Sequence, residues 1–249
     1  MRKRSAALGW ALAFVPLELS ADDALVAAAA NFAEPLTRLE RAFEASHPHR
    51  LRVAVGSTGK LYAQVLHGAP FDILLAADQE RPTLLERAGL AVPGSRRTYA
   101  VGRLTLWSAD PERIQGDVAA LLEAGNFRRL AMANPALAPY GAAAREVLQG
   151  FGLYATLRDR IVTAENIGQT HAMVATGNAE IGLVAASGIR ESDEGSRWEV
   201  PADLHGPIRQ DAVLLAHGAD NPAAQQFLQF LHGERARTII SDFGYGVNP

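Results

Sequence analysis

Cysteine is absent from this chain of 249 residues, which excludes a disulfide scaffold, a thiolate zinc site, an iron–sulfur cluster and a catalytic thiol. Positive charge is not in excess either, because 24 basic and 27 acidic residues give a formal net charge of −3. Binding to the phosphate backbone of a nucleic acid needs a basic face, so nucleic acid is not an expected partner. The serine-hydrolase elbow and the zinc-protease helix motif are also missing, and no enzymatic activity is expected.

Long hydrophobic runs are missing too, since no stretch approaches the roughly 20 apolar residues that span a bilayer. The longest run, Ala6 to Leu17, follows the basic segment Met1-Arg-Lys-Arg4 and precedes small residues that end at Ala21. This order is typical of a signal peptide over residues 1–21, so we expect export and a mature protein that begins near Asp22. A buried N-terminal helix is the alternative interpretation.

Apolar strands alternate with helical patterns along the rest of the chain, which predicts α/β construction. The near-continuous apolar segment from Phe71 to Ala77 is typical of a strand that is covered on both faces. Val101 to Trp107 is predicted to be one further strand. Near the start of the mature chain, Asn31 is well placed to cap the helix that begins just after Asn31. Two α/β lobes joined by crossing strands fit this length better than one sheet of ten strands.

A strand, a turn of small or hydroxyl-bearing residues and a helix follow one another four times. Each such turn presents backbone N–H groups at the positive end of a helix dipole, which favours a bound anion. In parallel sheets these turns gather at the carboxyl ends of the strands, where ligands bind. Four ordinary helix caps are the alternative. The turns are Ala30-Asn31, Ser57-Thr58-Gly59, Pro139-Tyr140-Gly141 and Asn166-Ile167-Gly168.

Longer motifs also occur, in order, over essentially the whole mature chain. They are Gly56-Ser-Thr-Gly-Lys60, Tyr62-Ala-Gln64, Gly68-Ala-Pro-Phe-Asp72, Ala76-Ala-Asp78, Asn134-Pro-Ala-Leu-Ala-Pro-Tyr-Gly141, Glu165-Asn-Ile-Gly-Gln169 and Phe243-Gly-Tyr245. In these motifs the chain resembles the periplasmic molybdate-binding proteins of ABC importers, and several of the motifs are long enough to be specific.

The resemblance implies a periplasmic receptor with the two-lobed periplasmic binding protein fold (type II), in which each lobe is a mainly parallel sheet flanked by helices. The ligand, molybdate or tungstate, is expected in the cleft between lobe I (residues 22–103 and 211–249) and lobe II (residues 104–210). The receptor is expected to be a monomer that delivers its anion to the membrane permease of an ABC importer. It is expected to need no cofactor besides this ligand.

The resemblance also carries over positions that bind the oxygens of the anion and, through them, the metal. The expected primary ligands are Asn31, Thr58, Tyr140 and the backbone N–H of Ile167. Secondary candidates are Ala30, Ser57, Gly59, Pro139, Asn166 and Ala185. Thr58 departs from the family, which usually has serine there, and Ala185 stands where one branch has a tyrosine. Another branch supplies that phenol from the position of Tyr140, which is therefore the expected phenol donor.

The expected donors are all neutral, which suits a dianion such as molybdate, whose four oxygens accept hydrogen bonds and carry no proton. Monohydrogen phosphate would bring a proton to a site without an acceptor, at a cost of about 1–3 kcal/mol. Sulfate passes this test, so a receptor for another tetrahedral oxyanion such as sulfate is the alternative. Lys60, the only lysine of the mature chain, is expected to be a solvated helix charge, and a supporting role is expected for His171.

Two other classes of protein remain open. An exported enzyme that acts on a phosphorylated or sulfated substrate would use Thr58 or Tyr140 as its nucleophile, but neither has a visible base beside it in the sequence. The effector-sensing domain of a transcription regulator shares the two-lobed architecture. The signal sequence and the absence of an N-terminal pair of DNA-reading helices argue against that class.

Overall fold

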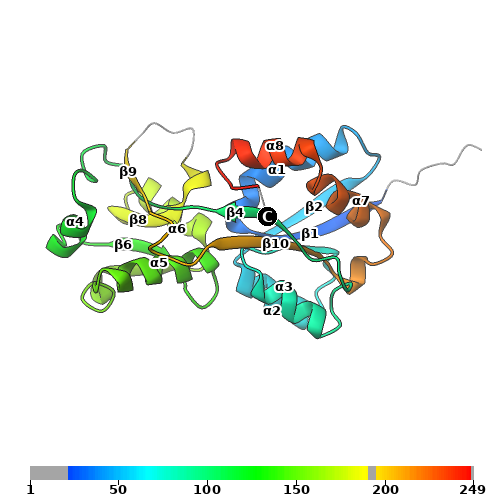
Figure 1. Cartoon of the computed structure of the whole chain (residues 1–249), viewed down its shortest axis with the longest axis horizontal. Helices are drawn as coiled ribbons and strands as arrows, with labels where there is room; N and C mark the ends of the chain where they lie inside the picture. Colours follow the sequence, from blue (N-terminus) through cyan, green and yellow to red (C-terminus); the bar gives the residue numbers. More distant parts are fainter. Residues whose placement is uncertain (1–21, 190–194, 248–249) are drawn as a thin grey trace, which may run out of the picture.

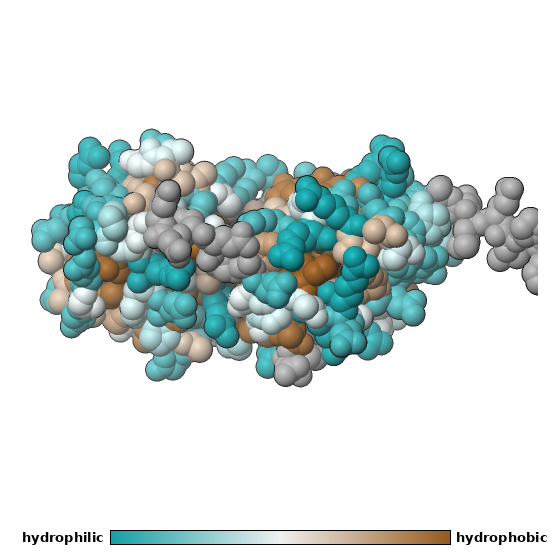
Figure 2. Space-filling model, turned by 90° about the horizontal axis from the view of Figure 1, so that it is seen from above, coloured by the Kyte–Doolittle hydropathy of each residue, from teal (hydrophilic) through white to brown (hydrophobic). Residues whose placement is uncertain are grey.

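The computed structural model describes residues 22–189 and 195–247. The predicted signal peptide, residues 1–21, lies outside the described residues. Within the described ranges no helix is both long and apolar enough to cross a membrane. The molecule is elongated, with one α/β lobe in each half (Figure 1). Hydrophilic residues cover most of the face seen in Figure 2, and hydrophobic residues form small, separated areas on it.

The first lobe, on the right in Figure 1, is built from both ends of the described chain. Its five strands have the order β2-β1-β3-β10-β4. β1 pairs in parallel with β2 and β3, whereas β10 runs antiparallel to β3 and β4. The strands are β1 (Asp23–Ala29), β2 (Arg50–Gly56), β3 (Ile73–Leu75), β4 (Arg97–Gly102) and β10 (Ile208–Leu214). The helices are α1 (Ala33–Glu44), α2 (Thr58–Leu66), α3 (Glu80–Arg87), α7 (Pro222–Leu231) and α8 (Glu234–Asp242), with the short η1 (Ala30–Phe32) and η4 (Ala216–Gly218).

The second lobe is built from the middle of the chain, and its strands have the order β7-β6-β8-β5-β9. β6 pairs in parallel with β7 and β8, whereas β5 runs antiparallel to β8 and β9. The strands are β5 (Leu104–Ser108), β6 (Leu130–Ala133), β7 (Ile161–Ala164), β8 (Ile181–Ala185) and β9 (Ser196–Glu199). The helices are α4 (Val118–Ala124), α5 (Pro139–Gly150) and α6 (Ile167–Ala175), with the short η2 (Arg158–Arg160) and η3 (Ala186–Gly188).

Helices cover both faces of each sheet, and the alternation of side chains along a strand decides which core each residue joins. In β1, Val26 and Ala28 join the core under α1, α7 and α8, whereas Ala27 joins the core under α2 and α3. In the second lobe, Met132 of β6 packs with α4 and α5, whereas Ala131 packs with α6. Strands that are buried on both faces explain the near-continuous apolar runs in the sequence.

The two-lobed α/β fold is confirmed, and each sheet is mixed. The pairings place four strands of each sheet in one direction and reverse the fifth, which is β10 in the first lobe and β5 in the second. These are the strands by which the chain enters a sheet after it has crossed from the other lobe. The crossing therefore explains why the sheets are not wholly parallel.

The prediction of one strand from Val101 to Trp107 is wrong. This segment is divided between β4 and β5, which belong to different sheets, and Arg103 lies between them. The chain returns to the first lobe between Glu199 of β9 and Ile208 of β10. The lobe boundaries expected at 103/104 and 210/211 stay predictions, and the first sheet resumes at Ile208.

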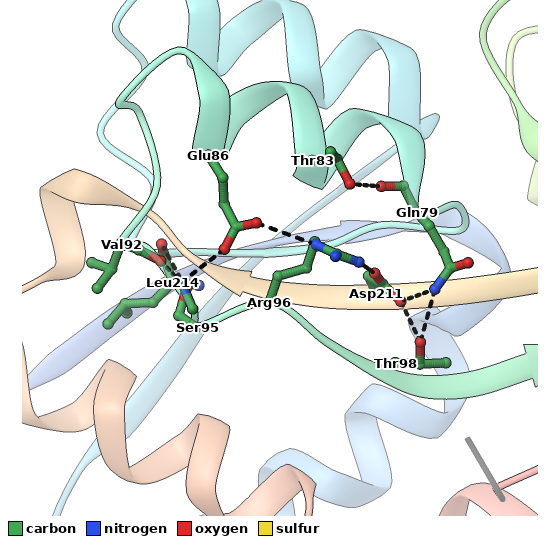
Figure 3. A network of polar contacts seen from close by, with 10 residues as sticks. Gln79, Thr83, Glu86, Val92, Ser95, Arg96, Thr98, Asp211 and Leu214 are labelled. Atoms are coloured by element: carbon green, nitrogen blue, oxygen red, sulfur yellow. Dashed lines mark hydrogen bonds and ion pairs between the residues drawn. The ribbon is translucent and has the colours of Figure 1, made fainter.

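β10 has an irregular register with β4, because the pairing shifts between Gln210 and Asp211. Asp211 is fully buried and forms an ion pair with Arg96 at 2.5 Å. Its carboxylate also accepts hydrogen bonds from Thr98 (2.6 Å) and Gln79 (3.2 Å), as Figure 3 shows. This network ties the start of α3 to β4 and β10 and anchors the Asp211 side of the irregularity.

Candidate functional site

A small cavity lies between the two lobes, next to the carboxyl ends of β1, β2, β6 and β7. The cavity volume is about 10 Å³. That is about the space that one water-sized sphere needs, against about 300–1,000 Å³ for pockets that take drug-sized ligands, so this cavity suits only a small solute. Its lining consists of Ala29, Ala30, Asn31, Gly56, Ser57, Thr58, Ala77, Ala138, Pro139, Tyr140, Asn166 and Ile167.

Four helices begin at the cavity, two from each lobe. η1, which leads into α1, begins at Ala30, and α2 begins at Thr58. α5 begins at Pro139 and α6 at Ile167. The first N–H groups of a helix have no partner within the helix, so each start can offer donors to an anion. Asn166 caps α6 as its position predicts, because its side chain accepts a hydrogen bond from the backbone N–H of Gln169 at 3.0 Å.

Two hydroxyl side chains, those of Ser57 and Thr58, lie at the start of α2. Ser57 occupies the N-cap position but makes no capping bond, and its Oγ is buried without a hydrogen-bond partner. Leaving such a group unsatisfied costs about 1–3 kcal/mol, so the Ser57 hydroxyl is suited to bind a solute in the cavity that it lines. Thr58 Oγ1 accepts from the backbone N–H of Ala77 at 3.0 Å, which leaves its own proton available as a donor.

Asn31 lies in η1 and does not cap α1, so the expectation of a capping role is wrong. The N-cap residue of α1 is Phe32, without any side-chain capping bond. The Asn31 side-chain nitrogen instead donates to Gln210 Oε1 at 2.8 Å and to the Tyr245 hydroxyl at 3.0 Å. These two bonds use both amide protons, so the donor that Asn31 can offer to the cavity is its backbone N–H.

Tyr140 lies in the first turn of α5 and is only 1% exposed. Burial, followed by the electrostatic influence of the Tyr245 hydroxyl, raises the pKa of Tyr140 well above its ordinary value, so the phenol keeps its proton and can donate it. The phenol oxygen accepts a hydrogen bond from Gln210 Nε2 at 3.2 Å. Gly102 provides the space, because a Cβ atom there would lie well inside contact distance of the Tyr140 hydroxyl.

The lobes are joined at the rim of the cavity. The backbone N–H of Gly59 in α2 donates to the carbonyl of Leu137 in the second lobe at 2.8 Å. Lys60 Nζ forms an ion pair with Glu165, which precedes α6, at 3.1 Å, and both side chains are partly exposed. The Gly59 N–H is therefore already engaged, and the Lys60 ammonium is paired across the lobes at the surface.

The structure brings together the four primary candidates at the cavity, Asn31, Thr58, Tyr140 and Ile167. Four of the six secondary candidates also line it, Ala30, Ser57, Pro139 and Asn166. In the described part of the chain, Gly59 and Ala185 are not among the lining residues. His171 of α6 lies outside the lining and stacks on Trp107 with ring centroids 4.8 Å apart, and burial lowers the pKa of His171.

Sequence reasoning missed a set of polar residues behind the cavity. The clearest case is Gln210, which is fully buried and bonds to both Asn31 and Tyr140. Gln210 lies between Arg209 and Asp211 in the polar first half of β10, so the sequence gives no local signal that its amide is buried. Tyr245 was noticed only as part of the closing motif, and nothing in the sequence placed it beside Asn31.

Charge is absent from the cavity wall, since no lining residue among those described carries a charged side chain. Nor do the described ranges contain a group of three or more His, Asp or Glu side chains that could hold a metal ion directly. The wall therefore offers backbone N–H groups, two hydroxyls and one phenol. Such a set of neutral donors suits a fully deprotonated anion whose oxygens all accept hydrogen bonds.

Two α/β lobes that enclose a small cavity lined by donors from both of them define a two-lobed solute-binding protein. The chain belongs to the bacterial extracellular solute-binding protein family, whose model matches residues 24–246. This family consists of binding proteins, which confirms the expectation that the chain is not an enzyme.

Known relatives are similar over nearly their whole length. The molybdate-binding protein ModA of Azotobacter vinelandii is 47% identical over 225 residues, which cover 89% of each chain. ModA of Rhodobacter capsulatus is 45% identical over 229 residues, which cover 92% of this chain and 90% of the relative. The solved structure of the Azotobacter vinelandii periplasmic molybdate-binding protein has a TM-score of 0.87 and 37% identity, and the match covers 91% of this chain and 100% of that one. The resemblance noted in the motifs is thereby confirmed.

Proposed function

We propose that this protein is a monomeric periplasmic receptor that binds molybdate, or tungstate of nearly the same size, and delivers it to the membrane permease of an ABC importer. The observation that carries this proposal is the cavity, which holds neutral donors from both lobes and, among the described residues, no charged lining side chain. The relatives named as molybdate-binding proteins support the choice of anion.

Both lobes contribute donors to the anion in this proposal. The first lobe supplies the backbone N–H of Asn31 and the hydroxyls of Ser57 and Thr58. The second lobe supplies the phenol of Tyr140 and the backbone N–H of Ile167. Hydrogen bonds to an ionised acceptor are roughly twice as strong as those between neutral groups. Because the full set exists only when the lobes meet, binding favours the closed arrangement.

The same donor set selects against protonated anions. Monohydrogen phosphate would place its proton against groups that can only donate, and a buried proton without an acceptor costs about 1–3 kcal/mol. Sulfate has no such proton and differs from molybdate mainly in its shorter bonds. Discrimination between sulfate and molybdate therefore depends on the width of the cavity.

Titration calorimetry of the purified mature protein with molybdate, tungstate, sulfate and phosphate tests the proposal. We expect micromolar or tighter binding of molybdate and tungstate, and much weaker binding of sulfate and phosphate. Preferential binding of sulfate would replace the proposal by a sulfate receptor. Failure of all four anions to bind would remove the oxyanion function altogether.

A further inference from the structure

A buried cluster of uncharged polar residues extends from the cavity wall into the protein behind it and draws on both lobes. Each member is less than 8% exposed. The cluster is linked by side-chain hydrogen bonds across the lobes, from Gln210 to Tyr140 at 3.2 Å and between Tyr245 and Ser187 at 3.0 Å. The polar cluster consists of Asn31, Tyr99, Tyr140, Ser187, Gln210 and Tyr245.

The Gln210 amide fixes the direction of the hydrogen bonds at the centre of this cluster. Its Oε1 accepts from Asn31 Nδ2 at 2.8 Å and from the Tyr99 hydroxyl at 3.1 Å. Its Nε2 contacts the Tyr140 hydroxyl, and an amide nitrogen can only donate. The Tyr140 oxygen is therefore the acceptor in this bond, and the Tyr140 proton must go elsewhere.

Tyr245 is the neighbouring hydroxyl that competes for the Tyr140 proton. Its own single proton is donated to the backbone carbonyl of Asn31 at 2.7 Å. Its oxygen is contacted by Asn31 Nδ2 at 3.0 Å and by Ser187 Oγ at 3.0 Å. The Asn31 amide fills one of the two lone pairs of this oxygen, whereas either hydroxyl can donate in the contact with Ser187. Tyr245 is thus a neutral acceptor that is already partly used. An anion in the cavity attracts the Tyr140 proton more strongly, because hydrogen bonds to a charged acceptor are roughly twice as strong.

Asp211, the residue after Gln210 in β10, helps to hold Gln210 in this position. The register shift in β10 lies between Gln210 and Asp211, and irregularities of this kind redirect side chains beside functional sites. Asp211 is anchored by its ion pair with Arg96 and its hydrogen bond from Thr98 (Figure 3). With Asp211 fixed in one direction, Gln210 is directed toward the polar cluster.

We propose that Gln210 is a positioning residue, which sets the Tyr140 hydroxyl so that its proton faces the bound anion. This inference rests on the proposed function and adds a residue that does not line the cavity. Because the Tyr140 oxygen accepts from Gln210, its proton is the group that Tyr140 offers to the anion. An anion that offers a proton to Tyr140 meets a donor there and not an acceptor.

A double-mutant cycle between Gln210 and Tyr140 tests this proposal, with molybdate affinity measured by calorimetry. Gln210→Met keeps the length of the side chain and removes its hydrogen bonds, and Tyr140→Phe removes the proton that Gln210 directs. We expect each single variant to bind molybdate about tenfold to hundredfold more weakly. The double variant should bind no more weakly than Tyr140→Phe alone, because Gln210 acts through Tyr140.

Losses that multiply in the double variant would overturn the proposal, because Gln210 would then act independently of the phenol. If Gln210→Met does not fold, as judged by circular dichroism and thermal unfolding, Gln210→Glu takes its place at pH 8. A carboxylate at position 210 would accept the Tyr140 proton and withdraw it from the anion. Gln210→Glu should therefore lower molybdate affinity more when Tyr140 is present than in the Tyr140→Phe background. Equal losses in the two backgrounds would contradict the proposal. Wild-type protein that does not bind molybdate would instead refute the proposed function.

Discussion

Ser57 shows at the scale of single residues how a local preference is set aside in the cavity. A serine at an N-cap normally accepts a hydrogen bond from a backbone N–H of the first turn, which stabilises the helix. Ser57 makes no such bond. The residue is 2% exposed, and its Oγ has no hydrogen-bond partner. The hydroxyl therefore contributes nothing to the stability of α2 and remains available to a ligand.

Ser57→Ala should consequently separate stability from binding. Removing an unsatisfied buried hydroxyl leaves the free energy of unfolding of the anion-free protein unchanged or slightly higher. Molybdate affinity should fall about tenfold to hundredfold, because a hydrogen bond to a charged group is worth about 1.5–3 kcal/mol. Denaturant unfolding and calorimetry measure the two quantities. Thr37→Ala, which removes an exposed hydroxyl of α1 that bonds only within its own helix, is the control and should leave affinity unchanged.

Residue types at the site could be predicted from the sequence, but the direction of their protons could not. The resemblance in the motifs predicted that Asn31 lies at the anion site, and Asn31 does line the cavity. Its amide protons are nevertheless used by Gln210 and Tyr245, which are 179 and 214 residues away in the chain. Partners at such separations are set by tertiary structure, and no local pattern encodes them.

At the scale of elements, the end of β4 approaches the start of α5 closely at the site. Gly102 ends β4, and the Tyr140 hydroxyl lies where the Cβ of any other residue at position 102 would be. A side chain at this position must therefore displace the phenol from its hydrogen bond with Gln210.

Gly102→Ala is expected to weaken molybdate binding by about tenfold to hundredfold, because it displaces the Tyr140 phenol, which donates a hydrogen bond to the charged ligand. Isothermal titration of the variant measures this loss. Gly150→Ala is the matched control, because a Cβ at the end of α5 meets nothing within 4 Å, and its affinity should equal that of the wild type. Equal affinities for Gly102→Ala and the wild type would show that the phenol is not held at this place.

Most elements could be predicted from apolar periodicity, because strands and helices covered by a core carry a strong local pattern. The division between β4 and β5 could not. Both strands are rich in buried residues, and only Arg103 separates them. The break depends on which sheet each half joins, which is a property of the whole fold.

At the scale of the whole molecule, several contacts join the two lobes around the cavity, and one of them is the ion pair between Lys60 and Glu165. Sequence reasoning expected Lys60 to be a solvated helix charge, and its side chain is indeed half exposed, at 51%. Its pairing partner follows β7 in the other lobe and could not be predicted without the closed arrangement. An exposed pair contributes only about 0.2–1 kcal/mol, so it tunes closure and does not determine it.

Lys60→Ala should accelerate the dissociation of molybdate by no more than about fivefold, because the pair exists only while the lobes are together. Stopped-flow measurement of the dissociation rate tests this, and the difference from the wild type should vanish in about 1 M salt, where charges are screened within about 3 Å. Arg52→Ala is the control, since its ion pair with Asp23 lies within one lobe. If both variants accelerate release equally, the pair across the lobes has no role in closure.

The direct test of the central claim, that neutral donors of both lobes bind molybdate, is a crystal structure of the loaded protein with anomalous data at the molybdenum edge. We predict one strong peak inside the cavity, with anion oxygens about 2.7–3.2 Å from the backbone nitrogens of Asn31 and Ile167 and the hydroxyls of Ser57, Thr58 and Tyr140. A peak outside the cavity, or anion oxygens bound to an arginine or lysine side chain, would contradict the account.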